Sequence, residues 1–150
     1  MKKIISFVFF LSLFGSLHSA PSKPNIIYIV SDDLGYGDLG SYGQKQVKTP
    51  RLDRMAKEGL RFTDHYAGHT VCRPARLVFL TGKHTGHTAI AGNNMHVLPK
   101  GTKTVTSLLK EAGYVTGGVG KWALGDVGTS GHPNNQGFDF FYGYLDQSAA

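Results

Sequence analysis

Residues 25–31 constrain the fold most strongly, because they form an uninterrupted run of mainly β-branched and aromatic residues, Asn-Ile-Ile-Tyr-Ile-Val-Ser. A strand with one solvent-facing side alternates apolar and polar residues, whereas a run without alternation is typical of a strand buried on both faces of a parallel sheet. Parallel strands need long crossover connections, which are usually helices. We therefore predict an α/β fold with a central, largely parallel sheet flanked by helices.

Glycine and proline divide the rest of the chain into short elements, and 20 of its 150 residues are glycine. In α/β folds with a parallel sheet, ligands bind beyond the carboxyl ends of the strands. Asp32, Asp33 and Lys121 lie at such strand ends. The predicted elements, in chain order, are a strand at 25–31, a glycine-rich loop at 35–43, a helix opening at Thr49-Pro50 and ending at Gly59, a short extended piece at 60–66, a helix following Pro74 and ending at Gly82, a helix at 104–112, a strand at 114–119 and a turn-rich tail at 125–143.

The first twenty residues have the pattern of a signal peptide. Lys2 and Lys3 precede an apolar run at 4–17, and small residues before and at Ala20 offer a cleavage region. The run is too short to span a bilayer, and no cysteine near the cleavage region could carry a lipid. We expect an exported protein, periplasmic or secreted, without a stable membrane anchor. A buried N-terminal helix is the alternative.

The charge of the chain excludes one class of partner. The formal charge is +6, of which Lys2 and Lys3 in the leader contribute two, leaving +4 for the remainder. The basic residues are scattered and form no block interleaved with aromatic residues, so we expect no nucleic-acid partner. A mild positive balance suits a small anionic substrate, but it suits an ordinary protein surface equally well.

Two adjacent carboxylates, Asp32 and Asp33, follow the first predicted strand. Like charges this close repel each other, and a bound divalent cation removes the conflict. Oxygen ligands select a hard ion, Ca²⁺ or Mg²⁺. The alternative is a turn in which both side chains only accept hydrogen bonds from backbone N–H groups.

Cys72 is the only cysteine, so it is an inert buried thiol, an intermolecular link or a chemically special residue. Pro74 suits a helix start, which would place Cys72 just before the first turn and its unpaired N–H groups. Arg76, on that turn, should point back toward the N-terminus, so an anion at residue 72 would meet both. An ordinary reactive thiol is the alternative. Val78 excludes the Cys-x5-Arg loop of cysteine-based phosphatases.

The stretch from Val71 to Gly82 resembles the signature of the type I sulfatases, Cys-x-Pro-Ser-Arg followed by Leu-Thr-Gly. Together with it, four further matches cover nearly all of residues 24–143. The resemblance implies an alkaline-phosphatase-like α/β sandwich. The four further segments, which resemble landmarks of the same family in the same order, are 24–35, 49–53, 120–125 and 136–139.

The resemblance also implies a mechanism. In this family a formylglycine-generating enzyme converts the cysteine into an aldehyde, whose hydrate attacks sulfur with one hydroxyl and expels sulfate with the other. By resemblance, Cys72 is the modified nucleophile, and Asp32 and Asp33 ligate Ca²⁺, or Mg²⁺, together with residue 72. Arg76 would hold the nucleophile, and Lys121 would contact it and the sulfate. The implied substrate is a sulfated carbohydrate or an aryl sulfate ester.

Two positions depart from the pattern of the family. Ala75 replaces the usual serine of the signature, although a small residue is retained. Ala123 replaces a histidine that assists at the nucleophile, so another histidine must move that proton or turnover falls. His69 and His84 flank the signature and are the candidates, with ordinary surface histidines as the alternative.

Members of this family run to several hundred residues, and their other metal ligands lie downstream. We therefore expect residues 21–150 to be the N-terminal portion of a sulfatase catalytic domain, with the sheet incomplete. Two alternatives stay open. One is a formylglycine-dependent phosphonate or phosphate ester hydrolase, and the other is a catalytically silent truncated chain.

Overall fold

The computed structural model of the chain describes residues 23–88, 92–94 and 96–146, so the expected leader at 1–20 lies outside the described residues. The chain divides after Asp33 into two units, Met1–Asp33 and Leu34–Ala150. Among the described residues, no helix has the length and apolar character needed to span a bilayer. The elements, all in the second unit, are η1 (Tyr36–Asp38), η2 (Gly40–Tyr42), α1 (Pro50–Glu58), α2 (Cys72–Thr81), η3 (Thr85–His87), α3 (Val105–Glu111), β1 (Gly117–Lys121), η4 (Pro133–Gln136) and β2 (Phe140–Tyr144), where η marks a 3-10 helix.

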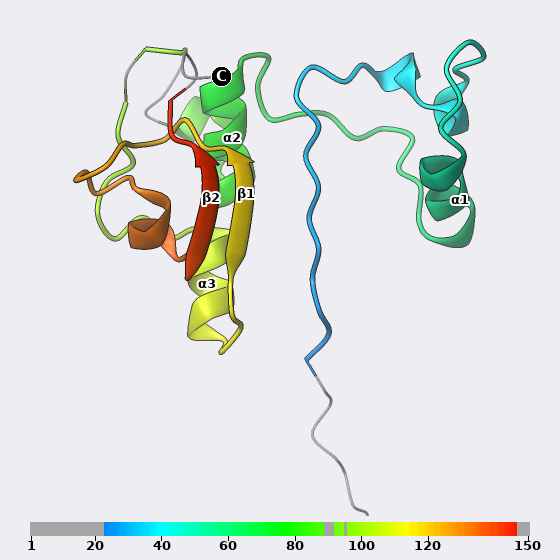
Figure 1. The fold of residues 1–150 in the computed structure, drawn as a ribbon. Coiled ribbons are helices and arrows are strands. Elements are labelled where there is room, and N and C mark those ends of the chain that lie inside the picture. Colours follow the sequence, from blue (N-terminus) through cyan, green and yellow to red (C-terminus); the bar gives the residue numbers. More distant parts are fainter. Residues whose placement is uncertain (1–22, 89–91, 95, 147–150) are drawn as a thin grey trace, which may run out of the picture. The chain divides into compact units, whose positions relative to one another are not determined.

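Strands β1 and β2 lie side by side and parallel, from Gly117 opposite Phe140 to Lys121 opposite Tyr144. The connection between them, residues 122–139, contains the 3-10 helix η4 in place of a full α-helix. Helices α2 and α3 lie behind this strand pair in Figure 1. The α/β prediction with parallel strand pairing is therefore confirmed.

The core forms where α2 meets the segments next to the two strands. Leu77 and Leu80 of α2 pack with Trp122 and Leu124, which directly follow β1. The indole N–H of Trp122 donates to the carbonyl oxygen of Gly131 at 2.7 Å, so this buried side chain keeps its hydrogen bond. The cluster is completed by Leu98, Phe138, Phe141 and Leu145.

The predicted helix ends are confirmed closely. Helix α1 begins at Pro50 and its C-cap is Gly59. Helix α2 ends in Gly82, whose φ of 64° is the left-handed conformation that glycine adopts without strain. Helix α3 is capped by Thr104, whose side chain accepts the Ser107 N–H at 3.1 Å. Capping residues act within one turn, which is why the sequence alone located them.

Polar contacts hold α1 to the preceding turn η2. The Asp53 carboxylate accepts the Ser41 N–H at 2.6 Å and the Thr49 hydroxyl at 2.9 Å. The same hydroxyl accepts the Gly40 N–H at 2.8 Å. Thr49 therefore bridges two elements and does not cap its own helix with its side chain, as its position had suggested.

Two predicted strands do not form. Residues 25–31 and 60–66 have no strand structure, and Ile27 and Leu60 are 85% and 80% exposed. A strand is stable only when its backbone groups pair with a neighbour. In the described part of the chain, such pairing joins only β1 and β2, so β propensity alone did not produce a strand at either place.

The remaining strand predictions need adjustment. The strand predicted at 114–119 is present but begins later, at Gly117, and extends to Lys121. Strand β2 lies inside the tail that was predicted to consist of turns. Its short aromatic run carries no period-two pattern, and its glycines indicated a turn. Only the pairing with β1 makes this segment a strand.

Candidate functional site

Cys72 is the first residue of α2, with Val71 as the extended N-cap. This corrects the prediction that Cys72 precedes the helix, because Pro74 occupies the third helical position and not the first. The Ala75 N–H donates to the Val71 carbonyl oxygen at 3.0 Å, which closes the first turn around Cys72. The thiol side chain is half-buried. It therefore lies within the first turn, where backbone N–H groups lack partners inside the helix.

Arg76 follows Cys72 by one helical turn and is half-buried. Its guanidinium donates through Nη1 to the carbonyl oxygen of Lys121 at 2.5 Å. Lys121 is the last residue of β1, lies opposite Tyr144 and is itself half-buried. The structure thus brings two predicted site residues, Arg76 and Lys121, together at the carboxyl end of the sheet, next to the helix that begins with Cys72.

Ala123 is 1% exposed and has a φ of 65°, a left-handed conformation that is unfavourable for alanine. Its N–H donates to the Leu145 carbonyl oxygen at 2.9 Å, and its carbonyl oxygen accepts from Arg73 Nε at 2.6 Å. An alanine at this position has no group that could transfer a proton. The departure from the family pattern therefore falls on a buried, strained residue next to the end of β1.

The structure distinguishes between the two histidines that are candidates for proton transfer. His69 is half-buried, and its Nδ1 accepts the Val71 N–H at 3.3 Å, directly before Cys72. His84 is exposed and lies beyond Gly82, at the opposite end of α2. A ten-residue helix is about 15 Å long. His69 is therefore placed near the thiol by the chain itself, and His84 is not.

Asp32 and Asp33 form an exposed turn, in which Asp33 has a φ of 56°. They end the first unit, whereas Cys72, Arg76 and Lys121 belong to the second. The predicted strand that was to present them at a sheet edge does not form. The described residues contain no group of three or more His, Cys, Asp or Glu side chains placed to hold a metal ion. Metal binding by these carboxylates stays a prediction.

Sequence reasoning missed Arg73, which is 4% exposed. Besides Ala123, its guanidinium binds the Asn93 carbonyl oxygen at 2.6 Å and the Asn94 carbonyl oxygen at 2.5 Å. One signal could have found it, because Arg73 and Arg76 are three residues apart and so share one face of α2.

The segment Gln136–Asp139, one of the sequence landmarks, has a structural role. Gln136 is 2% exposed, and its side chain donates to the Ser130 carbonyl oxygen at 2.8 Å. The Asp139 carboxylate accepts from Lys110 Nζ at 2.6 Å and from the Thr116 N–H at 2.9 Å. The hydrogen bond from Lys110, followed by that from Thr116, lowers the pKa of Asp139 to about 2. This landmark joins α3 to the starts of both strands.

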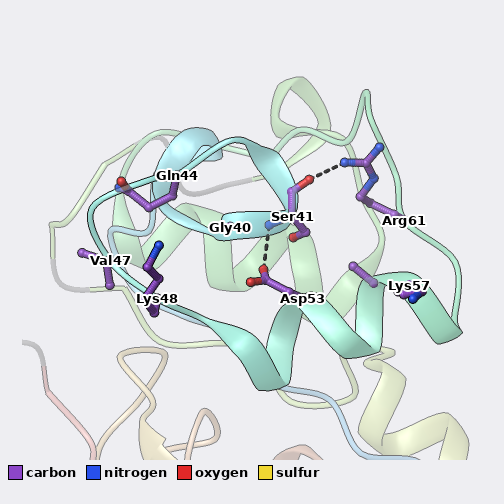
Figure 2. A pocket seen from close by; sticks show the side chains of 9 residues that line it. Gly40, Ser41, Gln44, Val47, Lys48, Asp53, Lys57 and Arg61 are labelled. Atoms are coloured by element: carbon purple, nitrogen blue, oxygen red, sulfur yellow. Dashed lines mark hydrogen bonds between the residues drawn. The ribbon is translucent and has the colours of Figure 1, made fainter.

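A separate hollow of about 550 Å³ lies between η2 and α1. Figure 2 shows Ser41 between Asp53 and Arg61, with the Arg61 guanidinium donating to the Ser41 carbonyl oxygen. Lys48 and Lys57 also line it. None of the predicted site residues lies in this hollow, and its central carboxylate is engaged in holding η2 to α1.

Comparisons with known proteins bear on the family and the fold of the chain. The family model described as Sulfatase matches residues 24–150. The chain is 41% identical to Arylsulfatase D of Homo sapiens and 46% identical to N-acetylgalactosamine-6-O-sulfatase of Bacteroides thetaiotaomicron, covering 81% and 82% of this chain but 23% and 26% of those proteins. The crystal structure of Ps i-CgsB in complex with k-i-k-neocarrahexaose matches with a TM-score of 0.77 and 41% identity, over 83% of this chain and 28% of that one. The chain thus spans about a quarter of the length of these relatives.

Proposed function

Because the chain belongs to the sulfatase family, we propose that the whole protein hydrolyses sulfate esters and that Cys72 is the precursor of its formylglycine nucleophile. One observation carries this proposal. Cys72 begins the ten-residue helix α2, and Arg76, one turn further along, binds the backbone of Lys121 at the end of β1. An anion held at residue 72 would meet the positive end of a helix and a guanidinium together.

The hydrated formylglycine supplies two hydroxyls on one carbon, one for attack on sulfur and one for the later release of sulfate. Arg76 offsets the negative charge at residue 72. Lys121, at the end of β1, stabilises the charge that develops on the sulfate oxygens. Since Ala123 cannot move a proton, His69 takes this task through Nδ1, the unprotonated nitrogen of its neutral ring, which releases the Val71 N–H in order to accept the proton. Overall, one water is consumed, and the alcohol and sulfate are released.

Asp32 and Asp33 supply the hard oxygen ligands that suit Ca²⁺, or Mg²⁺. When bound, the cation would neutralise these carboxylates and the sulfate group. Ca²⁺ takes about six to eight oxygen ligands, more than two carboxylates and residue 72 provide. We therefore expect residues 1–150 alone to give no sulfatase rate above that of a Cys72→Ala variant.

In the whole protein, Asp32→Ala or Asp33→Ala should lower bound calcium and activity together. Full activity of both variants after exhaustive chelation would show that these residues only shape a turn.

The relatives support a substrate class. The Bacteroides thetaiotaomicron relative is named N-acetylgalactosamine-6-O-sulfatase, and the solved structure of Ps i-CgsB is a complex with k-i-k-neocarrahexaose. We propose a sulfated carbohydrate as the substrate of the whole protein, with aryl sulfate esters as model compounds. The signal-peptide pattern of residues 1–20 supports export to the periplasm or medium, and a formylglycine-generating enzyme would be the maturation partner.

Peptide mass spectrometry tests the central claim. Conversion replaces the thiol sulfur of Cys72 by an aldehyde oxygen, an oxidation for which the maturation enzyme must supply the oxidant. After co-expression with that enzyme, the peptide containing residue 72 should be about 18 Da lighter than the thiol form. A peptide carrying only thiol would exclude Cys72 as the nucleophile precursor.

Rates of hydrolysis of aryl sulfates and aryl phosphates by the whole protein then distinguish a sulfatase from a phosphate or phosphonate ester hydrolase.

A further inference from the structure

Arg73 is a buried charge that the proposed chemistry does not use. Removing a guanidinium from water is costly unless hydrogen bonds compensate for the lost solvation. Arg73 has this compensation, because its donors reach three backbone carbonyl oxygens at 2.5–2.6 Å and the Asp146 carboxylate at 3.5 Å. The cost of burial is therefore offset by contacts that join separate segments of the chain.

These segments surround the start of α2. The carbonyl oxygens come from Asn93 and Asn94 in the loop before α3, and from Ala123 directly after β1. Asp146 follows β2. In addition, the Arg73 N–H donates to the Asn93 side chain at 3.2 Å. One side chain thus ties the first turn of α2 to three segments that are between 20 and 73 residues away in sequence.

The contact with Ala123 matters most for the site. Arg73 and Arg76 lie on one face of α2 and bind the carbonyl oxygens of Ala123 and Lys121, respectively. Two guanidiniums therefore hold α2 against the last residue of β1 and the turn that follows it. Ala123 keeps its left-handed backbone within this arrangement. Such strain persists where the surrounding contacts hold it.

We propose that Arg73 is a positioning residue of the candidate active site, which fixes the distance between residue 72 at the start of α2 and Lys121 at the end of β1. Arg73 does not itself touch the substrate. This inference rests on the proposed function for its kinetic consequence, whereas its structural part stands on the hydrogen bonds alone.

The test compares Arg73→Ala and Arg73→Lys in the whole protein, matured to formylglycine, with Arg54→Lys as the control. Arg54 lies on exposed α1 and pairs with Glu58 at 3.7 Å. For an aryl sulfate, misplacement of the reacting groups should lower kcat by about 10- to 100-fold in Arg73→Ala. KM should change by less than about threefold, because the groups that bind sulfate are still present. Arg73→Lys should lose nearly as much, since one ammonium cannot reproduce the planar fork, and Arg54→Lys should match the wild type.

Two further measurements separate positioning from general loss of folding. Guanidinium ion at millimolar concentration should restore part of kcat in Arg73→Ala and none in Arg73→Lys, whose side chain fills the space. Amide hydrogen exchange at residues 122–124 should accelerate in both Arg73 variants and not in Arg54→Lys. If Arg73→Ala does not fold, Arg73→Lys carries the test.

The outcomes are distinct. Wild-type kcat in a folded Arg73 variant would overturn the proposal, as would unchanged exchange at residues 122–124. A loss of kcat that guanidinium does not restore in Arg73→Ala would also count against it. If the matured wild type hydrolyses no sulfate ester, the proposed function fails, and the exchange measurement still decides whether Arg73 holds the turn.

Discussion

Two regions of the second unit contain similar residues but are held together differently. Where α2 meets the segments that follow β1, a cluster of apolar side chains is buried, and Leu124 is 0% exposed. Around η2 and α1, the structure is local and polar, held by Asp53, while Met55 and Leu60 are 63% and 80% exposed. We call these the core region (residues 71–146) and the α1 region (residues 34–66). The comparison teaches that a helix can form correctly from local signals while its apolar residues stay exposed.

The largest expected effect on stability comes from truncating one leucine side chain to alanine in each region. Leu124→Ala removes a fully buried side chain and should lower the free energy of unfolding by about 2–5 kcal/mol. The matched Leu60→Ala, at an 80% exposed position, should change it by less than about 0.5 kcal/mol. Urea unfolding followed by far-UV circular dichroism observes both regions, and fluorescence of Trp122, the only tryptophan, reports on the core separately. Equal losses in the two variants would show that the α1 region is also packed.

A pair of glycines with nearly equal backbone angles sharpens the comparison. Gly137 has a φ of 102°, and a Cβ there would lie 2.4 Å from the backbone N of Ser107 in α3. Gly43 has a φ of 106° and no atom within 4 Å of such a Cβ. Gly43→Ala should cost about 1 kcal/mol from backbone strain alone. Gly137→Ala should cost roughly 2–4 kcal/mol, because strain and a clash with backbone add.

Urea unfolding followed by far-UV circular dichroism observes both of these regions and suits this pair. A Gly43→Ala loss as large as that of Gly137→Ala would mean that crowding at α3 contributes nothing, and that both positions report only the backbone conformation.

The smallest expected effect concerns the pH dependence of the core region. Lys110 and Thr116 hold the pKa of Asp139 at about 2, against 3.8 ordinarily. A lowered folded-state pKa means that the unfolded chain binds the proton more readily. The contribution of Asp139 to stability is therefore complete above about pH 4 and is lost as the pH falls toward 2.

Asp139→Asn should consequently flatten the rise of unfolding free energy with pH between about pH 2 and 4, and added salt should weaken the difference because Lys110 and Asp139 are partly exposed. The control is Asp64→Asn in the α1 region, which removes a carboxylate that accepts the Thr63 hydroxyl at 2.8 Å. Parallel pH profiles for wild type and Asp139→Asn would contradict the assignment.

Much of the local structure was predictable from the sequence. Pro50, Gly59 and Gly82 mark helix ends that the structure reproduces, because capping depends on neighbours within one turn. Cys72 was placed one residue outside its helix, since Pro74 tolerates more than one position in the first turn. The strand predicted at 25–31 failed because pairing depends on a neighbour that propensity does not supply.

The sequence by itself determined the membership of the family, the positions of Cys72, Arg76 and Lys121 in its pattern, and the ends of the helices. The tertiary structure decided that β2 is a strand, that Arg76 binds the Lys121 backbone, and that Arg73 is buried with partners up to 73 residues away. The physical reason is the sequence separation between the groups that interact. Helical hydrogen bonds and caps close within about four residues, whereas strand pairing and the compensation of a buried charge require groups that only the folded chain brings together.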